Sequence, residues 1–98
     1  MAQFDVHRTH GAGLLLDCQN GSLAHLRTRI VVPLIPVDTA PAARDRLHPV
    51  FDIHGQDHLL ATHLVATVPT NELGKAIASL ASEHHIIVGA FDRLLTGV

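Results

Sequence analysis

The sequence has 98 residues, which is enough for one domain spanning residues 1–98 but too few for two. Hydrophobic residues make up 47% and charged residues only 16%, which excludes intrinsic disorder and, because so little charge covers the surface, predicts a homodimer. The formal net charge of −2, with 7 basic against 9 acidic residues, disfavours direct binding to DNA or RNA.

The first third of the chain predicts three strands separated by turns. Alternating polarity favours a strand over Gln3–His7, and an apolar run favours a buried strand over Leu14–Cys18. The Asn-Gly pair at 20–21 predicts a turn, because both residues tolerate positive φ. Residues branched at Cβ favour a strand over Arg27–Leu34. Pro33 indicates an edge position or a bulge in it, since proline has no N–H to donate.

The middle of the chain predicts further strands. The polar, alanine-rich segment 38–46 is typical of a loop with a helical turn. Val50–Ile53 predicts the next strand, and residues 55–57 predict the turn after it. The segment His58–Val68 predicts a long strand with a bulge or bend, which ends at Pro69.

The last part of the chain predicts a helix. In Leu73–Ala81 the apolar residues follow a helical spacing, but Gly74 weakens a helix, so the pattern leaves this segment ambiguous. Ser82 predicts an N-cap, and Gly97 predicts the end of the helix. The apolar stripe between them consists of Ile87, Phe91, Leu94 and Leu95. Strands followed by one amphipathic helix indicate a mainly β, α+β domain with an antiparallel, barrel-like sheet.

Several short motifs occur in an order that resembles one family. They are Gln3-Phe4-x-Val6, Leu16-Asp17-x-Gln19, the run Arg29–Leu34, Leu47-x-Pro49-Val50, Val68-Pro69 and Leu94-Leu95-Thr96-Gly97-Val98. Over nearly the whole chain the sequence resembles CcdB, the toxin of a bacterial type II toxin–antitoxin pair. The resemblance implies a small SH3-like barrel of the CcdB/MazF kind with an antiparallel sheet and a C-terminal helix. It also implies a homodimer and favours an extended conformation over Leu73–Ala81.

The same resemblance implies a toxin that acts by binding and is not an enzyme. Its target would be the A subunit of DNA gyrase, which it would trap with the DNA cut. A cognate antitoxin of the CcdA type would neutralise the toxin, and the two together would repress their operon. In that complex the antitoxin supplies the contact with DNA, which agrees with the acidic charge of this chain. No cofactor is implied.

The resemblance also implies which residues contact gyrase. By position they are Ser22 and Leu23 after the first turn, Asp92 on the helix, and Thr96, Gly97 and Val98 at the end of the sequence. Asp92 and Thr96 are four residues apart and share a helix face. The best-known family ending is Trp-Gly-Ile, so Thr96 lacks the aromatic face that would stack on target arginines, and a cation–π contact is lost.

The single cysteine, Cys18, excludes an internal disulfide and a cysteine-rich zinc site and fits a reducing compartment. Its apolar strand and its neighbour Asp17 favour a small buried side chain over a nucleophile. We expect Asp17 and Gln19 to bind local backbone groups. The sequence shows no signal peptide and no apolar run of about 20 residues, so we expect a cytoplasmic protein without membrane contact.

Nine histidines raise the hypothesis of a metal site. His54 and His58 have the spacing of helical zinc ligands, but Gly55 and the surrounding pattern predict a hairpin there. The adjacent His84 and His85 diverge on a helix. We therefore expect ordinary surface or hydrogen-bonded histidines, no metal site and no catalytic residues.

Two other functions stay open at this point. In an endoribonuclease of the MazF type, Arg27 or Arg29 would stabilise the phosphorane and a histidine or aspartate would act as base. The acidic charge and the scarcity of aromatic residues disfavour this function. In the other, a toxin homologue with weak or lost gyrase activity would mainly bind its antitoxin, which Thr96 favours. Arg27 and Arg29 alternate onto one face of the third predicted strand, where they contact either an acidic partner or solvent. Arg44 and Arg46 are expected in solvent.

Overall fold

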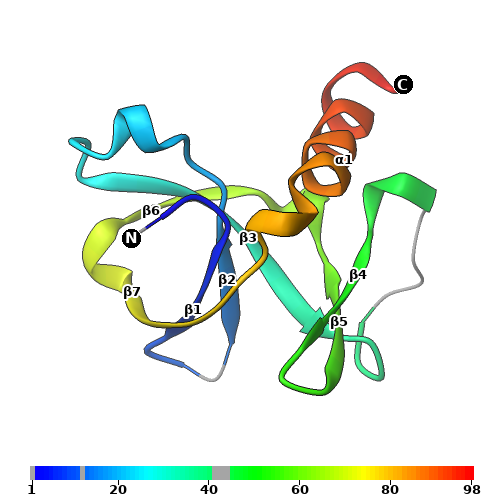
Figure 1. Ribbon diagram of the computed structural model, residues 1–98, viewed down its shortest axis with the longest axis horizontal. Helices are drawn as coiled ribbons and strands as arrows, with labels where there is room; N and C mark the ends of the chain where they lie inside the picture. Colours follow the sequence, from blue (N-terminus) through cyan, green and yellow to red (C-terminus); the bar gives the residue numbers. More distant parts are fainter. Residues whose placement is uncertain (1, 12, 41–44) are drawn as a thin grey trace.

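The computed structural model describes residues 2–11, 13–40 and 45–98. Over these residues, seven strands form one antiparallel sheet in the order β4-β5-β3-β2-β1-β7, with β6 paired to β3. The strands are β1 (Asp5–Thr9), β2 (Leu14–Asp17), β3 (Thr28–Pro36), β4 (Val50–Ile53), β5 (Gln56–Leu60), β6 (Ala66–Pro69) and β7 (Leu73–Ser79). The sheet curls into a half-barrel, and the helix α1 (His84–Thr96) stands at one end of it (Figure 1). This confirms the mainly β, α+β, SH3-like barrel.

The core lies inside the curl of the sheet. The central strands β2 and β3 contribute Leu16 and Val32, and α1 contributes Ile87, all with no exposed surface. Burying a side chain of this size contributes about 1.5–3 kcal/mol. Strand β4 has the predicted bounds Val50–Ile53 and alternates between exposed and buried residues, and β2 ends one residue before the predicted strand Leu14–Cys18.

Strand β3 is an interior strand, so the edge position predicted from Pro33 is wrong. Its residues Thr28–Val31 pair with β6, whereas Leu34–Pro36 pair with β5. Pro33 falls between these two partners and its carbonyl accepts a hydrogen bond from the Ala61 N–H at 2.9 Å. The N–H and C=O of one residue point to the same side of a strand. The N–H that Pro33 lacks would therefore point to the gap between β5 and β6, where no strand partner needs it.

The β4–β5 hairpin turns one residue earlier than predicted. Ile53 pairs with Gln56, which leaves a two-residue loop of His54 and Gly55 instead of a turn over residues 55–57. Both loop residues have positive φ, 53° and 86°, as tight hairpin loops require. The predicted long strand His58–Val68 is also wrong, because the 3₁₀ turn η3 (Thr62–Leu64) divides it into β5 and β6.

Two further turns correct the sequence-based boundaries. Strand β1 begins two residues later than predicted, after Phe4, which has a φ of 69°. At positions 20–21 a turn does form, but its cause is side-chain capping, because Asn20 has a φ of −59°. The Asn20 Oδ1 accepts the Ser22 N–H at 2.8 Å and begins the 3₁₀ turn η1 (Gly21–Leu23). The predicted loop 38–46 lies partly outside the described residues, and residues 45–47 form the 3₁₀ turn η2 (Asp45–Leu47).

The segment with helical periodicity is the strand β7, as the family resemblance implied. It pairs with β1 through two register irregularities, so its apolar residues lose the strict alternation of a regular strand. Gly74 is needed in this pairing, because a Cβ atom there would lie 2.7 Å from the Arg8 carbonyl oxygen. The close contact between β1 and β7 thus explains a glycine that weakened the helical interpretation.

Helix α1 differs from its prediction at the N-terminus and along its apolar stripe. Its N-cap is Glu83 and not Ser82, because the 3₁₀ turn η5 (Ala81–Glu83) precedes it. Ile87 is fully buried, but Leu95, predicted on the same stripe, is 76% exposed. Among the described residues, no helix has both the length and the apolar character to cross a membrane.

Candidate functional site

The C-terminal end of α1 has a conformation fixed by local hydrogen bonds. Gly97 adopts a left-handed conformation with φ of 76°, and its N–H donates to the Arg93 carbonyl at 3.1 Å. The Thr96 hydroxyl donates to the Asp92 carbonyl at 2.7 Å, and the Arg93 guanidinium donates to the Gly97 carbonyl at 2.6 Å. The glycine predicted to end the helix does so, and Asp92 and Thr96 lie on one face as predicted.

The last residues lie on the outside of the molecule. Val98 is 70% exposed, and its carbonyl oxygen accepts a hydrogen bond from the guanidinium of Arg46 in η2. Arg46 is exposed to solvent as expected and in addition contacts Val98, while Arg44 lies outside the described residues. The end of the chain is held against η2 from outside and does not enter the core.

The predicted gyrase-binding residues fall into two separate groups in one chain. Asp92, Thr96, Gly97 and Val98 are together at the end of α1, whereas Ser22 and Leu23 lie on η1. Figure 1 shows η1 and the C-terminus on opposite sides of the barrel. Both groups are exposed and therefore available for contacts.

A buried ion pair replaces the predicted arginine face of β3. Arg29 is 2% exposed, and its Nε and Nη2 donate to the Asp17 Oδ2 at 3.0 and 2.6 Å. The other Asp17 oxygen accepts the Gln19 N–H at 3.1 Å, and the Gln19 side chain binds the Ile30 N–H and the Leu23 carbonyl. Arg29 therefore faces neither a partner nor solvent, whereas Gln19 binds local backbone as expected.

Cys18 packs against the core beside this ion pair. Burial, with a smaller contribution from the neighbouring Asp17 carboxylate, raises the pKa of the Cys18 thiol to about 12. A thiol with so high a pKa is a poor nucleophile at neutral pH. The environment therefore favours the packing role expected from the sequence.

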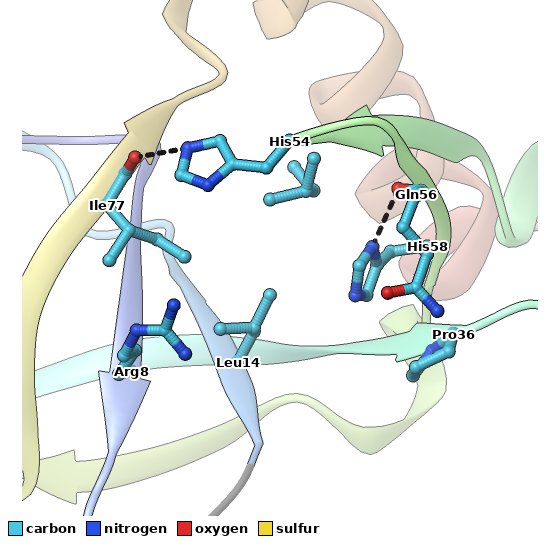
Figure 2. Close-up of a pocket in the computed structure, with 8 residues that line it drawn as sticks. Arg8, Leu14, Pro36, His54, Gln56, His58 and Ile77 are labelled. Atoms are coloured by element: carbon cyan, nitrogen blue, oxygen red, sulfur yellow. Dashed lines mark hydrogen bonds between the residues drawn. The ribbon is translucent and has the colours of Figure 1, made fainter.

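The histidines lie in several places, and one pair of them lines a cavity. His48 Nε2 and His63 Nδ1 are 2.8 Å apart, and the rings of His84 and His85 have centroids 4.5 Å apart. Within the described part of the chain, no group of three or more His, Cys, Asp or Glu side chains is placed to hold a metal ion. His54 and His58, separated by the hairpin, line one cavity with Arg8 and Gln56 (Figure 2).

No local sequence pattern contains this cavity, so the sequence alone does not predict it. Its lining comes from β1, β2, β3, β7 and the β4–β5 hairpin, which become neighbours only when the sheet curls. The four-residue spacing of His54 and His58 is the signal in the sequence that points to this place. This spacing suggests a helical metal site, whereas the hairpin brings both side chains to the cavity.

Comparison with known proteins decides the family. The sequence profile described as "CcdB protein" matches residues 3–97. The chain belongs to the CcdB family. A search of the curated proteins finds no match to the sequence.

Solved structures share the fold of this CcdB family member. The toxin MazF-mt6 of Mycobacterium tuberculosis is 20% identical with a TM-score of 0.75, over 91% of this chain and 93% of that one. An endoribonuclease from Mycobacterial species is 17% identical with a TM-score of 0.77, over 97% and 90%. A further endoribonuclease from Mycobacterial species, solved in complex with its cognate antitoxin, is 18% identical with a TM-score of 0.77, over 97% and 94%. At these identities the likeness concerns the fold.

Proposed function

We propose that this protein is the toxin of a type II toxin–antitoxin module and acts by binding the A subunit of DNA gyrase. It traps gyrase with its DNA cut and makes or breaks no bond itself. Membership of the CcdB family over residues 3–97 supports the toxin function. The contact surface consists of Asp92 and Thr96 on α1, Gly97 and Val98 just after it, and Ser22 and Leu23 on η1.

The observation that carries this proposal is the exposed end of α1. Leu95 and Val98 are 76% and 70% exposed, so large apolar side chains face solvent on the last turn of α1 and just beyond it. The hydrogen bonds at Asp92, Arg93 and Gly97 fix this end before any target binds, which reduces the ordering cost of binding. Thr96 provides a hydroxyl and a methyl group where other family members stack a tryptophan. The apolar contacts of Val98 therefore contribute a larger share of the binding free energy.

The proposal includes further partners of the toxin. It acts in the cytoplasm as a homodimer, is neutralised by a cognate CcdA-like antitoxin, and represses its operon together with that antitoxin, which contacts the DNA. The complex of an endoribonuclease with its cognate antitoxin, on the same fold, supports an antitoxin partner. The exposed apolar residues of α1, including Ile86 and Val88 at 50% and 42%, favour protein contacts on the helix.

The test is induced expression of the full chain in a bacterial host that contains gyrase. We expect growth arrest, accumulation of gyrase–DNA cleavage complexes and capture of the gyrase A subunit by the tagged toxin. Removal of Thr96–Val98 should abolish arrest and weaken gyrase A binding by at least about tenfold. A truncated chain that arrests growth and captures gyrase A as well as the complete one would overturn the site.

A matched pair of variants tests the second part of the surface. Leu23 and Leu26 are both exposed, at 42% and 43%, but only Leu23 belongs to the proposed contact. Leu23→Ser should weaken capture of gyrase A, whereas Leu26→Ser should leave it unchanged. Equal effects of both substitutions would remove η1 from the contact surface.

Endoribonuclease activity is the second candidate function, because solved endoribonucleases share this fold. Arg29 does not fit the phosphorane-stabilising role, since Asp17 neutralises it in the interior. Discrete cleavage of total RNA by the purified protein would favour this candidate. Lack of growth arrest, gyrase capture and RNA cleavage would instead favour a homologue that only binds its antitoxin.

A further inference from the structure

The cavity between β1, β7 and the β4–β5 hairpin is a polar site that the proposed function leaves unused. Its volume is about 260 Å³, which is ample for a polyatomic anion, given that a water molecule takes up about 30 Å³ in the liquid. Figure 2 shows Arg8, His54 and His58 around this space, each from a different part of the fold. Arg8 and His54 are exposed, whereas His58 is only 6% exposed.

Backbone carbonyl groups orient both imidazoles. The Nε2–H of His54 donates to the Ile77 carbonyl at 2.8 Å, and the Nδ1–H of His58 donates to the Gln56 carbonyl at 3.0 Å. A carbonyl oxygen can only accept, so these contacts fix which ring nitrogen carries hydrogen. The second nitrogen of each ring has no hydrogen-bond partner among the described residues and is turned toward the cavity in Figure 2.

The ionisable side chains that line the cavity are all basic. Among the described residues that line it, Arg8, His54 and His58 are the ionisable ones, and no carboxylate is present. Asp57 lies between Gln56 and His58 on β5 and therefore points to the other face of the hairpin. Asp52 on β4 uses its Oδ1 to accept the Gly55 N–H at 2.7 Å. The linings from β2, β3 and β7 are apolar, which strengthens electrostatic contacts inside.

The backbone holds two of these groups in place. His54 has a φ of 53°, a conformation that most residues with a side chain avoid. The tight hairpin loop maintains this conformation and aims the imidazole across the cavity toward β7. On the facing side, Gly74 lets β7 approach the Arg8 backbone closely. The hairpin and the pairing of β1 with β7 thus set the positions from which His54 and Arg8 reach the cavity.

We propose that this cavity binds a phosphate group, either as inorganic phosphate or as a phosphodiester of a nucleic acid. The planar guanidinium of Arg8 binds two phosphate oxygens, and the protonated imidazoles donate to the remaining ones. A carboxylate has only two oxygens, which the arginine alone satisfies, so donors from three directions favour the tetrahedral anion. The site is separate from the proposed gyrase contact and needs no chemical step.

The test is a titration of the full chain followed by backbone amide NMR shifts. The probes are inorganic phosphate, a short single-stranded oligouridylate and acetate. We expect the two phosphate probes, but not acetate, to shift amides of the hairpin and β1. Much tighter binding of the oligouridylate would identify nucleic acid as the source, and equal binding would identify free phosphate. Absent shifts, or equal binding of acetate, would overturn the proposal.

Variants of the cavity have matched controls elsewhere on the surface. Arg8→Gln and His54→Asn should each weaken phosphate binding by about tenfold or more, because each removes a charge-assisted hydrogen bond. His54→Asn creates an Asn-Gly loop, which suits the hairpin and keeps the chain folded. Arg27→Gln and His10→Asn change the same residue types outside the cavity and should have no effect. Binding that survives both cavity substitutions would contradict the proposal.

The pH dependence provides a readout specific to the imidazoles. The free ring nitrogen donates to an anion only when the imidazole is protonated, so the oligouridylate should bind more weakly as the pH rises from about 5.5 to about 8. The phosphodiester keeps its charge in this range. His54→Asn should reduce the pH dependence, and affinity that rises with pH would contradict the geometry.

Discussion

Arg29 and Arg8 lie on strands of the same sheet but have opposite surroundings. Arg29 is inside the barrel, where Asp17 binds both its Nε and its Nη2. Arg8 is exposed and lines an open cavity together with the imidazoles of His54 and His58. A charge removed from water needs its partner within the fold, whereas a hydrated charge at a cavity can exchange water for a ligand. The same residue type therefore has a structural role on β3 and is free for recognition on β1.

Arg29→Met is expected to have the largest effect of the changes that test this comparison. It leaves the Asp17 carboxylate buried without its counter-ion and should lower the free energy of unfolding by about 3–5 kcal/mol. Urea denaturation measures this loss. The double variant Asp17→Leu/Arg29→Met should recover much of it, and Arg8→Gln should change stability by less than about 0.5 kcal/mol. Similar losses for Arg8→Gln and Arg29→Met would contradict the distinction.

The next largest expected effect is on the alkylation rate of Cys18, because this thiol lies next to Asp17, the buried partner of Arg29. With a pKa of about 12 in place of 9.0, the thiolate fraction at a pH of about 8 falls roughly a thousandfold. Iodoacetamide should therefore alkylate Cys18 about a thousandfold more slowly in the folded protein than in urea. Equal rates in the folded and unfolded protein would mean that the Cys18 thiol is open to solvent.

The same pKa shift predicts how stability depends on pH. The folded thiol keeps its proton to a higher pH than the unfolded thiol, so its contribution to stability is lost as the pH rises from about 9 toward about 12. The sequence has no tyrosine and only one lysine, so few other side chains change charge in this range. Cys18→Ala should flatten this part of the stability profile.

His54→Asn should have the smallest effect on stability and tests whether the cavity residues, unlike Arg29, are dispensable for the fold. Asparagine adopts a positive φ more readily than most residues, so the substitution should leave the free energy of unfolding unchanged or raise it by up to about 0.5 kcal/mol. Thermal unfolding measures this change. A clear loss of stability would mean that the His54 side chain, like Arg29, is part of the structural framework.

Local pattern accounts for much of the fold. Apolar runs and residues branched at Cβ located β2, β3 and β4, and Gly97 located the end of α1. Periodicity was misleading in β7, where the two register irregularities with β1 leave apolar residues at a helical spacing. Pro33 was misleading for a related reason, since two different strands continue the sheet on one side of β3. In both cases the pairing partner is distant in sequence.

The sequence by itself determined the mainly β order followed by a helix, the exposed turn at Gly97 and the family. These follow from composition and from interactions within a few residues. Only the tertiary structure decided that Arg29 is enclosed with Asp17 and that Arg8, His54 and His58 line one cavity. The reason is that the partner of a charge depends on strand register and sheet curvature, which arise from packing between segments far apart in the chain.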